Sequence, residues 1–387
     1  MRGLALLRPR ALVLCAVLGA LGVAGCSSQT NSVVSVTGST LTIYGSRGGG
    51  GPGSVGGQTV TDVLDAEQLA LRQNGSTVGK YSVSFVKLAG ATPSDDARTA
   101  VQNQSAIAYL GEIQPGTSQV SVEITNELDL LQVSPTDTAV YLTQATPAVP
   151  GAPGKYYPSS SSYHETFARV VPNTAQEAKA IVSEMQALHL TKLYADPSGD
   201  GQPYGKSIAL EVRQDAPAQG LTLVSSPSGA DAVFYGGNSA SAATPALDRA
   251  ADASPAAKLF VPSALYDTTF ASGLSATAQR NLYVSSPGFT SRTLTPAGKQ
   301  FQSSFASAYG HAPAPEAIFG YEAMSAVLAV LKEAGSAADS RGIVVSDFRA
   351  IKNRSSALGT YSIQNGDTTI APFVFAQYRA GALVPLP

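Results

Sequence analysis

Residues 106–118 read Ala-Ile-Ala-Tyr-Leu-Gly-Glu-Ile-Gln-Pro-Gly-Thr-Ser, and the alternation that decides the fold is contained in them. Ala106–Tyr109 is a short apolar run typical of a buried strand, and apolar spacing predicts an amphipathic helix over Ser118–Glu127. Glycine and small hydroxyl residues fill the loop between them. A strand that leads through a short loop into a helix is the repeating unit of a parallel sheet covered by helices.

The same alternation extends along the chain in both directions. Further strands are expected at 41–44, 81–86, 130–133, 191–194, 221–224, 232–235, 258–261 and 282–285. Further helices are expected at 59–72, 175–188, 205–214, 299–309 and 321–333. The sequence therefore predicts the α/β fold class, with parallel sheets and a proline- and glycine-rich loop at 146–162.

Composition supports a folded chain with a small-molecule role. Hydrophobic residues make up 44% and charged residues 13% of the 387 residues, which is typical of globular proteins and sufficient for two lobes. The formal net charge is −2, and three arginines stand at the very start of the chain. The remainder is thus more acidic still, which argues against nucleic acid as a partner.

Cys26 stands at the end of a segment that is typical of a secretory signal. Arg2, Arg8 and Arg10 precede an apolar stretch at 11–21, and Val23-Ala24-Gly25 supplies the small residues of a cleavage site. A cysteine in this place resembles the lipobox of bacterial lipoproteins, in which it is lipidated. The expectation is a signal peptide at 1–25, a flexible tether at 26–40, and a protein anchored on the outer face of the cell membrane.

Two other interpretations of this segment stay open: an uncleaved membrane-anchored helix, or ordinary secretion with an incidental thiol. The second cysteine, Cys15, lies within the segment to be removed. No disulfide is therefore expected in the mature protein.

Catalytic chemistry has little support in the sequence. The three histidines, His164, His189 and His311, are not paired at metal-ligand spacing, and no G-x-S-x-G turn is present. Ser198-Gly199-Asp200-Gly201 lacks the spaced acids of a calcium loop. No enzymatic activity, cofactor or metal is expected.

A glycine-rich loop at 47–57 follows one predicted strand and precedes a predicted helix. Backbone amides in such a position can hold an anion, and Arg47 would then contact its carboxylate. The loop is equally well explained as a flexible connector.

Five motifs in order resemble the Leu/Ile/Val-type substrate-binding proteins of branched-chain amino acid ABC transporters. They are the strand–loop–helix unit from Ala106 to Ser118, the turn at 131–136, the crossover Phe167–Asn173, Asp196 with Tyr204-Gly205, and Ala230–Gly237. The resemblance covers Leu41 to Pro387.

The resemblance implies a type I periplasmic binding protein, with two Rossmann-like lobes that close on a ligand like a Venus flytrap. Three crossovers are expected, near Arg169, Ser286 and Gly359. The first lobe then comprises 41–168 and 288–358, and the second comprises 169–287 and 359–387. Ligands of such sheets bind beyond the carboxyl ends of the strands.

The resemblance also implies a ligand site. A ligand carboxylate would bind the amides and hydroxyls at the start of the helix that opens at Gly116, and Tyr204 would reach across from the second lobe. The full set of expected ligand-binding residues is Gly116, Thr117, Ser118, Thr136, Asp137, Thr138, Tyr204, Tyr235, Ser263 and Arg47.

One departure from the family bears on the ligand. Relatives that bind α-amino acids place an acid where this chain has Ser263, and a buried ammonium without a carboxylate is costly. Either Asp137 or Asp267 replaces that acid, or the ligand is not an α-amino acid. Asp137 is explained equally well as a cap of its own turn.

The function implied is an extracytoplasmic solute-binding lipoprotein. It would capture an amino acid, amide or carboxylate as a monomer and deliver it to an ABC permease with its ATPase. A receptor module of the same fold that senses a ligand and signals to a partner is the alternative.

Overall fold

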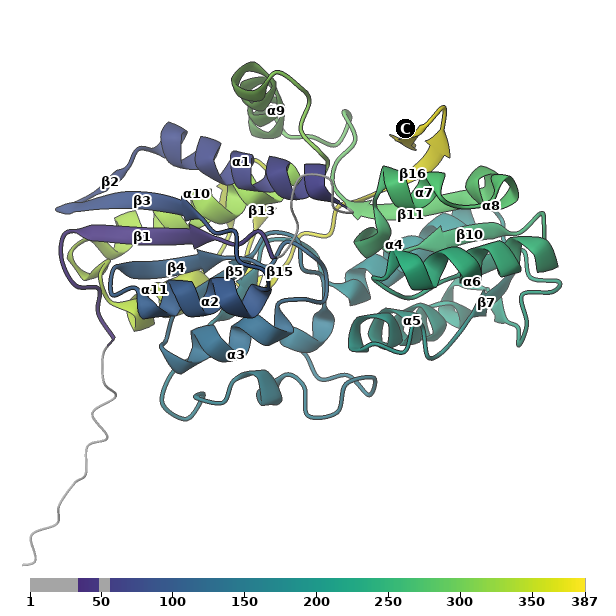
Figure 1. Cartoon of the computed structure of the whole chain (residues 1–387), viewed down its shortest axis with the longest axis horizontal. Helices are drawn as coiled ribbons and strands as arrows, with labels where there is room; N and C mark the ends of the chain where they lie inside the picture. The colour runs from purple at the N-terminus through teal and green to yellow at the C-terminus, as the bar shows by residue number, and fades with distance from the viewer. Residues whose placement is uncertain (1–33, 49–55, 387) are drawn as a thin grey trace, which may run out of the picture. The chain divides into compact units, whose positions relative to one another are not determined.

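The computed structural model describes residues 34–48 and 56–386 of the chain. Two mixed sheets dominate it, and each is flanked by helices (Figure 1). Most strand pairs in both sheets are parallel, which confirms the predicted α/β class.

The first sheet has the order β2-β3-β1-β4-β5-β6. Its central strands are buried throughout, because helices cover both faces. The short β2 pairs antiparallel with β3, and the other pairs are parallel. The strands are β1 (Thr40–Gly45), β2 (Thr77–Val78), β3 (Tyr81–Lys87), β4 (Ala106–Leu110), β5 (Leu131–Ser134) and β6 (Phe167–Arg169).

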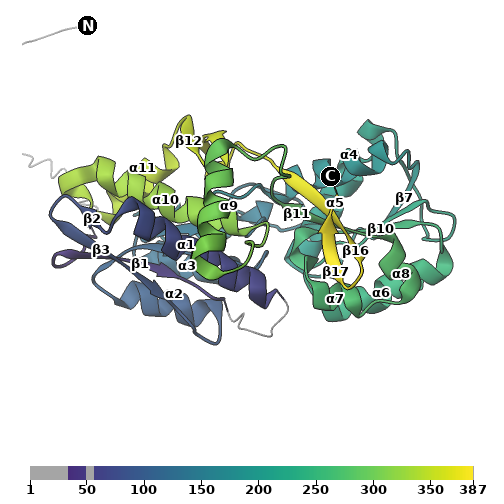
Figure 2. The same cartoon turned by 90° about the horizontal axis from the view of Figure 1, so that it is seen from above.

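The second sheet has the order β17-β16-β11-β10-β9-β7-β8. Strands β7 to β11 are parallel, and β16 and β17 add an antiparallel edge that Figure 2 shows in yellow beside β11. The strands are β7 (Lys192–Ala195), β8 (Thr222–Leu223), β9 (Ala232–Phe234), β10 (Lys258–Val261), β11 (Leu282–Pro287), β16 (Phe373–Arg379) and β17 (Ala382–Pro385).

The helices follow the strands as the alternation predicts. Those associated with the first sheet are α1 (Gly57–Asn74), α2 (Pro93–Gln102), α3 (Gln119–Glu127), α9 (Pro296–Tyr309), α10 (Ala317–Ala334) and α11 (Arg341–Arg349). Those associated with the second are α4 (Thr174–Ala187), α5 (Pro203–Asp215), α6 (Ala240–Ala253), α7 (Thr268–Ser272) and α8 (Ala276–Asn281). Two small hairpins, β12–β13 (Arg354–Ser356 with Gly359–Tyr361) and β14–β15 (Ile363–Gln364 with Asp367–Thr368), precede β16.

The packing of α10 on α1 forms much of the first core. Helix α10 is buried on most of its circumference, in agreement with its apolar sequence. At Gly320 a Cβ atom would lie 2.6 Å from the carbonyl oxygen of Val63 in α1. Glycine is therefore required for the two helices to approach this closely.

Residues 34–40 differ from the expected tether. Val36 is buried in the first core, its N–H donates to the carbonyl of Asp339, and Arg341 N–H donates to the carbonyl of Val34. The buried Val36 side chain and these backbone hydrogen bonds hold this part of the segment against the fold. The rest of the expected tether, the signal peptide and Cys26 lie outside the described residues.

The chain passes from the first sheet to the second after β6 and returns after β11. Tyr361 and Ile363 still pack in the first core, whereas β16 belongs to the second sheet. The third passage therefore falls between Gln364 and Phe373, later than the expected position near Gly359. The residue limits of the two lobes stay a prediction.

Candidate functional site

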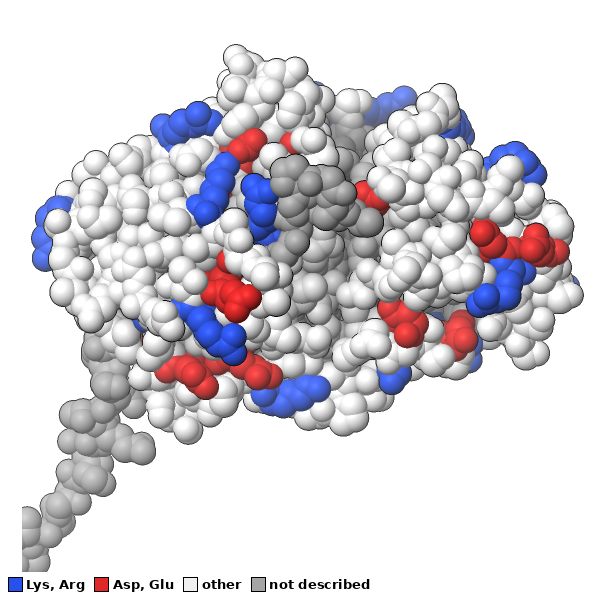
Figure 3. Space-filling model, in the orientation of Figure 1, with Lys and Arg blue, Asp and Glu red and all other residues white. Residues whose placement is uncertain are grey.

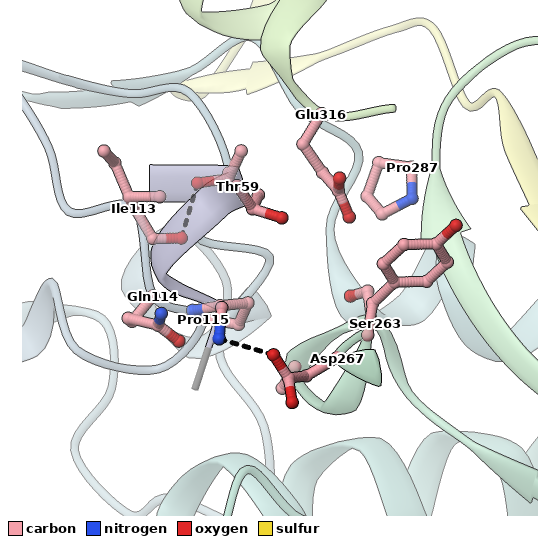
Figure 4. A pocket seen from close by; sticks show the side chains of 12 residues that line it. Thr59, Ile113, Gln114, Pro115, Ser263, Asp267, Pro287 and Glu316 are labelled. Atoms are coloured by element: carbon pink, nitrogen blue, oxygen red, sulfur yellow. Dashed lines mark hydrogen bonds between the residues drawn. The ribbon is translucent and has the colours of Figure 1, made fainter. Parts of the chain in front are cut away.

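A small cavity lies where the carboxyl ends of strands from both sheets face each other (Figure 4). On the side of the first sheet, the cavity is lined by residues that follow β4 and β5 and by the first turn of α1. On the side of the second sheet, it is lined by residues that follow β10 and by the last residue of β11. The volume is about 40 Å³, which suits a small head group or very few water molecules. The lining residues are Gly56, Thr59, Ile113, Gln114, Pro115, Thr136, Ser263, Ala264, Tyr266, Asp267, Pro287 and Glu316.

Glu316 contributes the most distinctive group in this cavity. It stands directly before α10 and is 5% exposed. Its Oε1 accepts a hydrogen bond of 2.6 Å from Ser286 Oγ, whereas Oε2 has no partner among the described residues. Burial raises the pKa of Glu316 to about 7, against the lowering effect of the Ser286 hydrogen bond. A nearby Glu177 raises it further.

Glu177, in the first turn of α4, lies behind the same wall of the cavity. Its Oε1 accepts from Ser263 N–H and from Ser285 Oγ, each at 2.6 Å. Burial raises the pKa of Glu177. These bonds fix the backbone at Ser263, whose own hydroxyl has no partner among the described residues and faces the space that Glu316 also enters (Figure 4).

Asp137 occupies the backbone amides at which the family resemblance implies a ligand carboxylate. Its Oδ1 accepts from Gly116 N–H at 2.7 Å and its Oδ2 from Ser118 N–H at 2.8 Å. Oδ1 also accepts from Ala139 N–H at 3.0 Å. The carboxylate is fully buried, so it fills the start of α3 with a negative charge from the chain itself.

The hydroxyl groups of the residues next to Asp137 are also used in hydrogen bonds within the protein. Ser118 Oγ accepts from Glu112 N–H, and Thr117 Oγ1 donates to the carbonyl of Gln114. Gly116 has φ of +82°, and a Cβ there would lie 2.9 Å from Tyr204 Cβ. Helix α5 thus approaches the start of α3 closely, which leaves no lining role in the cavity for Gly116, Thr117 or Ser118.

Thr138, after β5 of the first sheet, contacts Tyr204 in α5 beside the second sheet, as expected if Tyr204 reaches across to the first lobe. Their hydroxyl oxygens are 3.3 Å apart, and both residues are buried. Asn238 makes a second contact of this kind, because its Nδ2 donates to the carbonyl of Pro115 at 3.0 Å.

The other expected ligand-binding residues do not all lie at the same cavity. Thr136 and Ser263 line the cavity, whereas Tyr235 lies in a second, larger cavity of about 700 Å³ beside β7 and β9. Arg47 is partly buried and does not line either cavity. Most of the glycine-rich loop lies outside the described residues.

Asp267 does reach the cavity, but both of its oxygens are engaged. Oδ1 accepts from Phe270 N–H and caps α7, and Oδ2 accepts from Gly56 N–H at the start of α1, each at 2.7 Å. Asp267 therefore connects a helix of the second sheet with a helix of the first.

Sequence reasoning missed Glu316, Glu177 and the segment Ile113–Pro115. The only signal at Glu316 is an acid placed immediately before the most apolar helix. Asp96, in the first turn of α2, is a further buried acid that the sequence analysis does not single out; it is 1% exposed and accepts from Ser46 Oγ. It is buried because it closes a hydrogen-bonded cluster under the first turn of α2.

Comparisons with solved structures find the same arrangement over most of the chain. A leucine-binding protein from Thermotoga maritima superposes with a TM-score of 0.69 at 17% identity, over 90% of this chain and 97% of that one. The isoleucine complex of a branched-chain amino acid transporter substrate-binding protein from Streptococcus pneumoniae gives 0.66 at 16% identity, over 90% and 100%. The chain has the type I periplasmic binding protein fold.

Other comparisons bear on this binding-protein fold. Residues 225–382 match the family described as periplasmic binding protein. A solute-binding protein of an ABC transporter from R. palustris, in complex with benzoate, superposes with a TM-score of 0.65 at 16% identity, over 90% of this chain and 95% of that one. None of the curated proteins compared with the chain matches it. The family match and the fold confirm the resemblance that the sequence motifs indicate.

Further features of the described residues concern membrane spanning, metal binding and surface charge. Over residues 34–48 and 56–386, no helix is long and apolar enough to cross a bilayer, and no group of three acids, histidines or cysteines is arranged to hold a metal ion. On the face drawn in Figure 3, basic and acidic side chains are interspersed.

Proposed function

We propose that this protein is an extracytoplasmic solute-binding protein of an ABC transporter, which captures a small polar ligand between its two sheets and delivers it to a permease. The observation that carries the proposal is the cavity lined from both sheets at the carboxyl ends of β4, β5, β10 and β11. The structural similarity to a leucine-binding protein and to binding proteins in complex with isoleucine and benzoate supports binding rather than catalysis.

The cavity gives such a protein a physical means of reporting its ligand. A molecule that contacts Thr136 on one side and Ser263 on the other favours the arrangement in which the two sheets approach. Ligand and closure are then linked, because a ligand shifts an equilibrium by as much as its affinities for the two states differ. A permease that recognises the approached form would accept loaded protein in preference to empty protein.

Binding is tested first with a thermal-shift screen of amino acids, amides, short carboxylates, amines and sugars. A ligand present at about 100 times its dissociation constant adds about 2.7 kcal/mol to the free energy of unfolding. We expect at least one class to raise the melting temperature by several degrees and to be recovered chemically unchanged. If every class leaves the melting temperature unaltered, or if the molecule is recovered as a product, the proposal is wrong.

Membrane anchoring is part of the proposal and rests on the sequence before Cys26. The chain offers a matched control, because Cys15 and Cys26 are its two cysteines. In a bacterial host supplied with radioactive palmitate, we expect label in the wild type and in Cys15→Ser. Cys26→Ser should lose the label and appear in the soluble fraction. Label retained by Cys26→Ser contradicts a lipid anchor at this residue.

A further inference from the structure

We propose that the ligand of this cavity is an aliphatic amine without an α-carboxylate, whose ammonium group binds the free carboxylate oxygen of Glu316. This inference rests on the proposed solute-binding function and specifies the chemical class of the solute. It is carried by three features: the charges that line the cavity, the unpartnered oxygen of Glu316, and the occupation of the α3 amides by Asp137.

The lining of the cavity is acidic. Glu316 and Asp267 are its charged residues, and no lysine, arginine or histidine is among the described residues that line it. Glu177 and Asp62 add negative charge close to Glu316. An anionic ligand would therefore meet like charges in a region of low dielectric, whereas a cation gains attraction from all of them.

The free oxygen of Glu316 points to a missing hydrogen-bond donor. A buried carboxylate oxygen without a partner is costly, and here it faces the cavity with the unpartnered Ser263 hydroxyl nearby (Figure 4). An ammonium group carries three donors and no acceptor. It can donate to Glu316 Oε2 and Ser263 Oγ together, and the cavity volume of about 40 Å³ is enough for this head group.

Asp137 removes the counterpart site for a carboxylate. Gly116 N–H and Ser118 N–H already donate to its two oxygens, at 2.7 and 2.8 Å. A ligand carboxylate would have to displace a fully buried aspartate and leave that charge without partners. An α-amino acid therefore has a site for its ammonium group but none for its carboxylate in this part of the protein.

The acid at Glu316 makes binding depend on pH. Burial holds its pKa at about 7, so near neutrality part of the empty protein carries a protonated Glu316. Glu177 of α4, Asp62 of α1, and Tyr266 and Asp267 after β10 are the titratable groups that surround it. An ammonium ligand favours the ionised form, so binding releases a proton and strengthens as the pH rises from 6 to 8.

The test is isothermal titration calorimetry on the wild type with four probes: 1,4-diaminobutane, butylamine, leucine and butyrate. We expect the two amines to bind and leucine and butyrate to bind at least 100-fold more weakly. Titration near pH 7 in two buffers of different ionisation enthalpy should show proton release on amine binding. Glu316→Gln should weaken amine binding at least 100-fold and abolish the proton release.

Glu127→Gln, at an exposed site on α3, is the matched control and should bind as the wild type does. The melting temperatures of both variants show whether each is folded. If leucine or butyrate binds and the amines do not, the solute-binding function stands and this inference is wrong. It is also wrong if Glu316→Gln is folded and binds amines normally. If none of these probes binds, and no class in the thermal-shift screen binds, both proposals are overturned.

Discussion

Replacing Asp137 with alanine should destabilise the protein even when no ligand is present. The carboxylate accepts three buried backbone hydrogen bonds, from Gly116, Ser118 and Ala139, and the substitution leaves all three donors unsatisfied. Hydrogen bonds to a charged group contribute about 1.5–3 kcal/mol each, and the loss of a helix cap alone costs about 1 kcal/mol. Water that enters the space recovers part of this, so we expect a loss of about 4 kcal/mol.

Urea unfolding followed by far-ultraviolet circular dichroism measures this loss, since the chain has no tryptophan for fluorescence. If the described residues, 34–48 and 56–386, unfold together, about 4 kcal/mol corresponds to a fall in melting temperature of about 5 °C. Asp252→Ala, at an exposed position in α6, is the control and should change the melting temperature by less than about 2 °C.

A second measurement separates the loss of this anion from a general loss of packing. In Asp137→Ala the three amides form an empty anion site, so acetate at about 100 mM should restore part of the melting temperature. The wild type and Asp252→Ala should not respond in this way. If Asp137→Ala melts within 2 °C of the wild type, the assignment of Asp137 as an internal cap is refuted. Where the alanine variant does not fold, Asp137→Asn, which keeps one acceptor oxygen, should fold with an intermediate stability.

Three further substitutions test other parts of the fold. Arg169 Nε lies 2.8 Å from the carboxylate of Asp367, and Arg169→Ala removes this buried ionic partner. Urea unfolding should show that the free energy of unfolding falls by about 3–5 kcal/mol, and a fall below 1 kcal/mol contradicts the assignment. Gly199 and Gly220 both have positive φ, but only at Gly199 would a Cβ atom lie close to backbone atoms, at 2.5 Å. Gly199→Ala should therefore lower the melting temperature clearly more than Gly220→Ala, and equal effects would show that only φ matters. Burial raises the pKa of Glu211 from 4.5 to about 8, so between these pH values the folded protein binds more protons than the unfolded chain. Its free energy of unfolding therefore falls as the pH rises. Glu211→Gln should reduce this dependence of stability on pH, and an unchanged dependence would mean that another group titrates.

The order of elements could be predicted from sequence because buried parallel strands leave continuous apolar runs. The run at 258–261 is β10 residue for residue, and the run at 106–109 is β4 less its last residue. Helices α6 and α11 are not predicted by the sequence analysis. Helix α6 contains Pro245, which is disfavoured inside a helix, and α11 is only nine residues long.

The site was less accessible to sequence reasoning, because its residues meet only through tertiary structure. The family resemblance implies roles for Ser263 and Thr136, and both line the cavity. Glu316 was missed because it arrives from the start of a helix far along the chain, with no local pattern to mark it. At Asp137 the choice between a ligand contact and a cap depended on two amides some twenty residues away, whose positions only the fold determines.

The bond from Gly56 N–H to Asp267 bears on the proposed solute-binding role, because it affects how well a permease could distinguish ligand-loaded protein from empty protein. One charge-assisted hydrogen bond is equivalent to about 1.5–3 kcal/mol, or a bias of roughly 10- to 150-fold in favour of the form in which it exists. Because this bond joins two groups of the protein itself, it favours the arrangement in which the two sheets approach each other whether or not a ligand is bound. In the solute-binding role proposed above, a contact outside the ligand would then limit how well loaded protein is distinguished from empty protein, and weakening that contact would lower ligand affinity while sharpening the distinction.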